Sequence, residues 1–152
     1  MSKMTLRPAT LEDSELIFSW RNSELVRRQS FNPQIMHFEN HQAWFEKSLQ
    51  NKNRFILIAE LHKEPLGVFR LDTLTNNEVS LFLNPSVIGK GYGESLLEAG
   101  ITWIRENLPH ISHLEAKVMP TNIASTKIFE KQGFIKKFIS YEKVIDNKER
   151  LL

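Results

Sequence analysis

The sequence predicts a mixed α/β (α+β) fold in which a mostly antiparallel sheet carries helices on both faces. Residues 54–84 contain three apolar strand patterns separated by short polar turns, which is typical of an antiparallel meander. A glycine-rich turn at Gly89–Gly93 then leads directly into a long amphipathic helix pattern. A further strand pattern at 113–119 follows this crossover helix, so it should run parallel to its neighbour in the sheet. The length of 152 residues predicts a single domain over 1–152.

The first third of the chain predicts one strand and two helices. A short strand is expected at 4–9, and Thr10–Asp13 fits a capping box that opens the first helix. Residues 23–37 predict a loop or a broken helix, because they lack periodicity and contain a proline. The second helix is expected over 39–49. The apolar side chains expected to face the core from this part are Leu16, Ile17, Trp20, Phe38, Trp44, Phe45 and Leu49.

The middle of the chain predicts the meander and the longest helix. Strands are expected at 54–60, 66–72 and 78–84, and the first of them is apolar on both faces, which favours a central position. The helix after the glycine-rich turn should span 92–107, because Pro109 stops it.

The last third predicts a strand, a helix and a second strand. After the strand at 113–119, a helix begins at Thr121 or Asn122 and ends at Gly133. An antiparallel strand is expected over 134–144, and residues 146–152 are expected to fray. The helix should face the core with Ala124, Ile128 and Phe129.

The composition excludes several classes of function. The 20 basic and 18 acidic residues give a net charge of +2, which is too balanced to predict nucleic-acid binding. The chain has no cysteine, so disulfides, thiolate metal sites and cysteine nucleophiles are excluded. Its 5 histidines lack a metal-binding spacing, and no metal is expected. Without a signal-peptide pattern or an 18-residue apolar run, the expected location is cytoplasmic, with no membrane partner.

The glycine-rich turn is the strongest local indication of a ligand. Three glycines before a helix let the backbone approach a ligand closely and aim free N–H groups at an anion such as phosphate. A turn without a ligand is the alternative. No Walker pattern is present, and Gly89, Gly91 and Gly93 do not give the G-x-G-x-x-G dinucleotide pattern. The remaining ligand-binding interpretation is a turn that holds a pyrophosphate and belongs to neither of these two types.

Three ordered motifs support a family resemblance. Ile88–Gly93 resembles the acetyl-CoA loop Q/R-x-x-G-x-G/A of the GNAT acetyltransferases, with Ile88 at the position of the usual Arg or Gln. The strand Glu78–Pro85 resembles the fourth strand of that family, and Asn122–Phe134 resembles its later N-x-x-[AS]…G-F segment. The resemblance covers about residues 54–138. It implies a GNAT fold with six to seven strands, whose fourth and fifth strands splay apart to admit the pantetheine arm.

The resemblance implies acetyl-CoA as the cofactor and acetyl transfer to an amine as the reaction. Glu78 is the expected general base, often acting through water, and the alternative is an exposed strand residue without a role. The N–H of Leu81 is the expected oxyanion donor, and Leu83 should pair with pantetheine. The tyrosine that protonates the leaving thiolate in many family members is replaced by Phe129, which would form an apolar wall beside the thioester. Ser125 or Tyr141 are the candidate substitutes for this acid. The expected acetyl-CoA contacts are Leu81, Phe82, Leu83, Ile88, Gly89, Lys90, Gly91, Tyr92, Gly93, Glu94, Asn122, Ser125 and Phe129.

The N-terminal third suggests the acceptor. Its W-R-N, V-R and H-x-x-W-F pattern resembles bacterial GNAT enzymes that acetylate nucleotide-linked amino sugars of the pseudaminic-acid or legionaminic-acid type. This resemblance implies that arginines grip a diphosphate, while amide and aromatic groups contact the sugar or base. The expected acceptor-binding residues are Arg21, Asn22, Arg27, His41 and Trp44.

Two other functions stay open at the level of sequence. One is an N-terminal protein acetyltransferase of the ribosomal-protein type, whose front half is similarly helical. The other is a catalytically silent acyl-CoA-binding module, which the Ile88 and Phe129 departures favour. Neither the acceptor nor the oligomeric state follows from the sequence, and a homodimer is left open.

Overall fold

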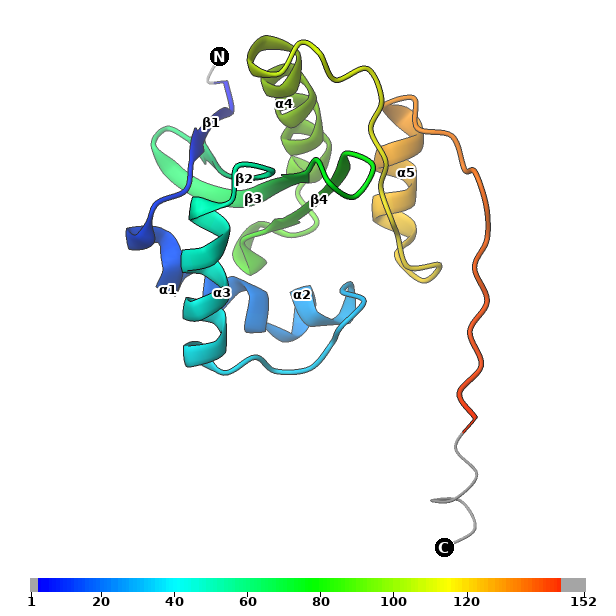
Figure 1. The fold of residues 1–152 in the computed structure, drawn as a ribbon, viewed down its shortest axis with the longest axis horizontal. Helices are drawn as coiled ribbons and strands as arrows, with labels where there is room; N and C mark the ends of the chain where they lie inside the picture. The colour runs from blue at the N-terminus through cyan, green and yellow to red at the C-terminus, as the bar shows by residue number, and fades with distance from the viewer. Residues whose placement is uncertain (1–2, 146–152) are drawn as a thin grey trace, which may run out of the picture.

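The structure is a computed structural model that describes residues 3–145, and it contains a four-stranded antiparallel sheet in the order β1-β2-β3-β4 (Figure 1). The predicted meander is confirmed, because β2 pairs with β3 and β3 pairs with β4. The strands are β1 (Thr5–Pro8), β2 (Arg54–Leu61), β3 (Glu64–Asp72) and β4 (Glu78–Leu83).

The helices follow the predicted pattern with small changes at their ends. The first predicted helix begins with a 3-10 turn, where the Thr10 N–H donates to the Asp13 carboxylate at 2.8 Å. The predicted broken helix is a short helix followed by an irregular loop at 29–37. The helical segments are η1 (Leu11–Asp13), α1 (Ser14–Asn22), α2 (Glu24–Arg28), α3 (Phe38–Gln50), η2 (Pro85–Val87), α4 (Tyr92–Asn107) and α5 (Ile123–Lys131).

The sheet separates two apolar cores, and Figure 1 shows α4 on one face with α1 and α3 on the other. The core beneath α4 contains Leu57, Ala59, Phe69, Leu71, Val79, Leu96, Leu97, Ile104 and Phe129. The core beneath α1 and α3 contains Ala9, Ile17, Trp20, Phe45, Ile56, Ile58 and Val68. Alternation along the strands explains the division, since odd-numbered residues of β2, β3 and β4 face α4 and even-numbered ones face the opposite way.

Close packing of α4 on the sheet fixes the position of the glycine-rich turn that precedes it. Gly100 lies against the ring of Phe69, and a Cβ at that position would overlap this ring. Because α4 begins at Tyr92, one residue after Gly91, its packing also orients the turn relative to the end of β4.

The predicted strand at 113–119 forms a single parallel bridge between Glu78 and Glu115. The Val79 N–H donates to the Glu115 carbonyl at 2.8 Å, and the Glu115 N–H donates to the Asn77 carbonyl at 3.1 Å. The predicted direction is therefore right, but the expected ladder is absent from the described residues. The segment diverges from β4 after this bridge, which is one reason why the described sheet has four strands and not six to seven.

The predicted strand at 134–144 is also absent from the described sheet. Residues 134–145, called the arm below, are extended and run away from the body of the molecule beyond α5 (Figure 1). Their apolar residues come largely in adjacent pairs, such as Phe138 with Ile139, which places one on each face of a strand. In the described sheet the arm is not among the paired strands, and Ile135, Phe138, Ile139 and Tyr141 are exposed. The predicted fraying at 146–152 lies outside the described residues.

Candidate functional site

The outer edge of β4 presents backbone groups that are not used by the sheet. The Asn84 N–H donates to the Leu66 carbonyl at 2.8 Å, so even-numbered residues of this strand bond to β3. Odd-numbered residues point the opposite way, as the bond from Val79 to Glu115 shows. The N–H groups of Leu81 and Leu83 therefore point away from β3, and neither has a partner within residues 3–145. An extended row of free amide groups is what a ligand that carries amides can pair with.

The turn after β4 has the geometry of an anion cradle. Gly89 and Gly91 have φ of 86° and 85°, a left-handed conformation that favours glycine. A Cβ built at either glycine meets nothing within 4 Å, so the space above them is open. No side chain caps the start of α4 at Gly91, and its first N–H groups are left for another acceptor. The positive end of a 16-residue helix faces this space.

The side chains around the turn have different environments. Lys90 is exposed, as is the Ile88 side chain at 40%. Glu94 forms an ion pair with Lys131 at 3.0 Å, and this pair offsets the negative charge of the Glu94 carboxylate, which lies close to the cradle. Gly93 packs against α5, because a Cβ there would lie 2.9 Å from Ile128 Cδ1. Its requirement for glycine therefore has a packing cause.

Glu78 lies where the open edge of β4 begins. Its carboxylate is on the sheet face opposite the buried Val79, and the ammonium of Lys117 is 3.6 Å away. The side chain is 26% exposed, so it is accessible from solvent. The bridge to Glu115 fixes its backbone. These features place an accessible carboxylate next to the free amides of β4.

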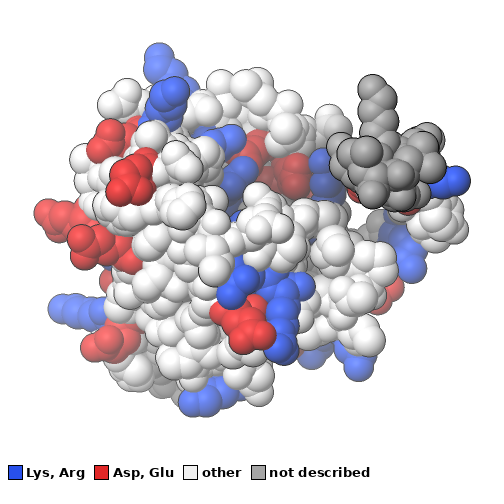
Figure 2. All heavy atoms as spheres, turned by 90° about the horizontal axis from the view of Figure 1, so that it is seen from below, with Lys and Arg blue, Asp and Glu red and all other residues white. Residues whose placement is uncertain are grey.

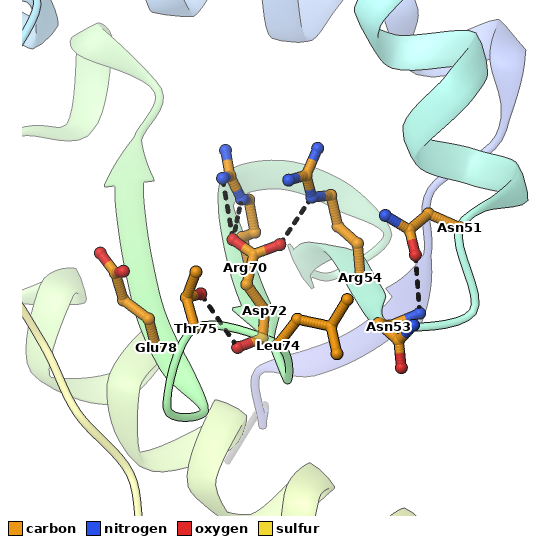
Figure 3. Close-up of a pocket in the computed structure, with 8 residues that line it drawn as sticks. All are labelled: Asn51, Asn53, Arg54, Arg70, Asp72, Leu74, Thr75 and Glu78. Atoms are coloured by element: carbon orange, nitrogen blue, oxygen red, sulfur yellow. Dashed lines mark hydrogen bonds and ion pairs between the residues drawn. The ribbon is translucent and has the colours of Figure 1, made fainter.

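A cavity of about 150 Å³ adjoins Glu78, and Figure 3 shows the side chains that line it. Asp72 lies opposite Glu78 in the β3–β4 register and accepts from Arg54 at 2.6 Å and from Arg70 at 2.8 Å. Both guanidinium groups lie over the ring of Trp44, at 5.5 and 5.3 Å from its centroid. The lining residues are Asn51, Asn53, Arg54, Arg70, Asp72, Leu74, Thr75 and Glu78.

The sequence analysis did not predict this cavity, although the even-numbered positions of its charged residues on the predicted strands indicated that they share one face of the sheet. Arg54, Arg70 and Asp72 are even-numbered residues on strands whose even-numbered positions face α1 and α3, as Glu78 does. The register of the meander brings them together, and register could not be read from the sequence without the turn geometry.

Asn22 of the predicted acceptor set has a structural role. Its Nδ2 donates to the Met36 carbonyl at 2.8 Å, and its Oδ1 accepts from the Met36 N–H at 2.9 Å. The amide group therefore holds the loop at 29–37, and its bond to sugar hydroxyls stays a prediction.

Arg21 and Arg27 contact the same loop. Arg27 donates to the carbonyls of Asn22 at 2.9 Å and Pro33 at 3.2 Å, and Arg21 Nη2 donates to the Asn32 carbonyl at 3.0 Å. Arg21 Nη1 is buried without a hydrogen-bond partner in the described part of the chain. Burial, and then the charge of Arg27, lower the pKa of Arg21. Neither arginine has an ion-pair partner among residues 3–145.

The two aromatic members of the predicted acceptor set differ in burial. His41 is 2% exposed, stacks on Phe45, and its Nε2 bonds to the Ser14 carbonyl at 3.1 Å. His41 is a core residue in this structure, and its contact with the acceptor stays a prediction. Trp44 is partly buried and supports the arginines of the cavity.

The predicted contacts from α5 are dominated by helix capping and core packing. Asn122 Oδ1 caps the helix by accepting from the Ser125 N–H at 3.1 Å. Phe129 is 8% exposed and packs edge-on against Phe134 at 5.0 Å between centroids, so its ring belongs to the core. Ala124 is exposed, against expectation. Tyr141, a candidate acid, is 90% exposed in the arm.

Residues 3–135 match the family model described as the acetyltransferase (GNAT) domain. The chain belongs to the GNAT family. This family model does not distinguish acceptors, so the narrower resemblance to enzymes of pseudaminic-acid or legionaminic-acid type stays a prediction.

The GNAT chain is also similar to individual proteins. An uncharacterized protein of Methanocaldococcus jannaschii is 26% identical over 141 residues, which are 89% of this chain and 28% of that protein. The chain therefore spans just over a quarter of the length of this curated relative. A solved domain from the same organism is 23% identical with a TM-score of 0.80, covering 93% of this chain and 94% of the other.

Two solved acetyltransferases share the fold. Spermidine N-acetyltransferase from Vibrio cholerae, in complex with CoA and spermine, has a TM-score of 0.83 at 18% identity and covers 95% and 88% of the two chains. An aminoglycoside acetyltransferase in complex with coenzyme A has a TM-score of 0.78 at 20% identity and covers 89% and 86%. Within residues 3–145, no helix has the length and apolar character required to cross a bilayer.

Proposed function

We propose that this GNAT chain is an acetyl-CoA-dependent N-acetyltransferase. The observation that carries the proposal is the succession of free β4 amides and an open glycine turn within residues 81–94. The two features have the chemistry that coenzyme A requires, since its pantetheine arm carries amides and its diphosphate is an anion. Membership of the GNAT family supports the same cofactor.

The residues present fit the pantetheine arm and the diphosphate of the cofactor. The N–H and C=O groups of Leu83 would pair with a pantetheine amide, as a neighbouring strand would, and the N–H of Leu81 would be left for the acetyl oxygen. The N–H groups at Gly89–Glu94 would hold the diphosphate at the positive end of α4. Ile88 replaces a polar side chain of the family pattern, but it leaves these backbone donors unchanged.

When bound, acetyl-CoA supplies an acetyl group activated as a thioester. Glu78 accepts the proton of the attacking amine, directly or through water. The Leu81 N–H donates to the acetyl oxygen as negative charge develops there. A thiol has a pKa of about 8.5, so the chain would not need a dedicated acid for the leaving sulfur. Phe129 replaces the tyrosine of other family members, and Ser125 or Tyr141 would be the substitute proton donor.

As acceptor we propose the amine of a nucleotide-linked amino sugar, such as a UDP-4-amino-4,6-dideoxyhexose. The uncompensated charges of Arg21 and Arg27 support an anionic group, and the buried Nη1 of Arg21 has a donor to spare. A diphosphate satisfies both requirements. An N-terminal protein acetyltransferase is the second candidate, and the accessible carboxylate of Glu78 favours either enzyme over a silent binding module.

The proposal is tested by combining calorimetry with kinetics. Acetyl-CoA should bind the wild-type chain, and Glu78→Gln should bind it with an unchanged Kd. The same variant should lose about 100-fold or more in kcat with the best acceptor, because the general base is removed. Glu106→Gln, an exposed change on α4, is the control and should keep both values. Absence of binding heat would refute the cofactor assignment, and an unchanged kcat in Glu78→Gln would refute the base.

A further inference from the structure

The charges around the cavity at Glu78 cancel almost completely. Asp72 is held between Arg54 and Arg70, and Glu78 has Lys117 as a neighbour. Among the described residues that line the cavity, no carboxylate is left to pair with a second cation of the acceptor. Seen from below, the centre of the surface shows basic and acidic side chains interspersed, while acidic side chains gather along its left edge (Figure 2).

The remaining lining groups are neutral and polar. Asn51 and Asn53 carry amides, and the Thr75 hydroxyl, which donates to the Asp72 carbonyl at 3.3 Å, lines the cavity together with the exposed Leu74 (Figure 3). Amides and hydroxyls both donate and accept, which matches the hydroxyl groups of a polyol. The cavity of about 150 Å³ is several times larger than one water molecule needs, so it has room for part of a polar ligand.

The walls of the cavity are held in place before any ligand arrives. Arg54 also donates to Ser48 Oγ at 2.9 Å, and Trp44 supports both guanidinium groups from below. Asp72 therefore has little freedom to turn toward a ligand cation. Fixed donors and acceptors lower the entropic cost of binding a polar ring.

We infer that this cavity binds the hydroxylated, uncharged part of the acceptor while the reacting amine lies at Glu78, and that it disfavours polyamines. The inference rests on the proposed acetyltransferase function and names the acceptor class for the same site. It adds the turns at 51–54 and 72–75 to the acceptor-binding residues proposed above.

Leu74→Trp tests the inference by filling the cavity mouth from an exposed position. Leu74 is 77% exposed, so a larger side chain should not disturb the fold. The KM for a hydroxylated amine, D-glucosamine or a UDP-linked amino sugar, should rise about 10-fold or more with little change in kcat. The calorimetric Kd for acetyl-CoA should stay at the wild-type value. Leu11→Trp is the matched control, because Leu11 is 52% exposed and lines a second cavity with Glu46 and Leu49.

Arg70→Gln tests the charge balance. The substitution removes one of the two ion pairs of Asp72 and leaves only the pair with Arg54. The Asp72 carboxylate is then more available to a cation of the ligand. The ratio of kcat/KM for spermidine to that for the hydroxylated amine should rise about 10-fold. Arg105→Gln, an exposed change on α4, should leave the ratio unchanged. Thermal unfolding of each variant verifies that it is folded.

The outcomes separate this inference from the proposed function. If acetyl-CoA binds but spermidine is the better acceptor, or no hydroxylated amine is acetylated, the inference is refuted and the cofactor assignment stands. Equal KM values for Leu74→Trp and Leu11→Trp would also refute it. If acetyl-CoA does not bind, both proposals fail.

Discussion

His41 lies in the apolar interface between α1 and α3, where its imidazole contacts Phe45 and the Ser14 carbonyl. Burial lowers the pKa of this histidine below its ordinary value of 6.5, and the positive charge of Arg21 lowers it further. The hydrogen bond to the Ser14 carbonyl raises the pKa and offsets part of this decrease. The neutral ring is therefore the form that the folded protein holds at neutral pH.

This burial predicts a loss of stability in mild acid. Below pH 6.5 the unfolded chain takes up a proton at His41 that the folded chain resists, so the free energy of unfolding falls. The loss continues down to the folded pKa at up to about 1.4 kcal/mol per pH unit. Urea unfolding at pH 7 and pH 5 should show a smaller pH effect in His41→Gln than in wild type. Equal pH effects would show that another group is responsible.

At the scale of single residues, the sequence indicates which side chains carry polar groups better than it indicates where the fold places them. Glu78 lines an accessible cavity, which the proposed role of a general base would require. Asn22 and His41 were selected for polar groups that the fold uses internally, to hold a loop and to bond a buried carbonyl. Nothing in a local pattern indicates which partner such a group will find, because the partners are 14 and 27 residues away in the chain.

At the scale of elements, the turn before α4 makes a direct prediction. Gly91→Ala should weaken acetyl-CoA binding about 10-fold or more, because the added methyl group occupies the space in which a phosphate would approach. Gly133→Ala is the matched control, since Gly133 has φ of 91° and the same open surroundings at the end of α5. Both variants should lose about 1–2 kcal/mol of stability to left-handed strain. Calorimetric titration distinguishes them, and equal affinities would exclude the turn from the cofactor site.

Elements with a strong periodic pattern were predicted closely. The helix at 92–107 matches α4 at both ends, and the three meander strands pair as expected. The segments at 113–119 and 134–144 were predicted as strands on propensity, but a strand also requires a partner edge. The first has a partner at one residue, and the second has none in the described sheet.

At the scale of the whole molecule, the arm predicts where a protease will cut first. Lys136, Lys137 and Lys143 are exposed in an extended segment, the conformation that protease active sites accept. Trypsin should therefore cleave the arm before it cleaves exposed sites within helices, such as Arg105 and Lys127. Mass spectrometry of a short digest should find a product that ends at Lys136 or Lys137. Protection of the arm would show that it is covered in solution.

The two halves of the proposed site differ in how the chain builds them. The groups expected to hold coenzyme A lie on one uninterrupted stretch, from the free amides of β4 to the first turn of α4. The cavity beside Glu78 is assembled from separate turns and strand ends, at 51–54, 70–75 and 78. Substitutions in those turns can alter which amine is accepted without disturbing the stretch that holds the acetyl donor. The donor half can thus be inherited intact while the choice of acceptor diverges.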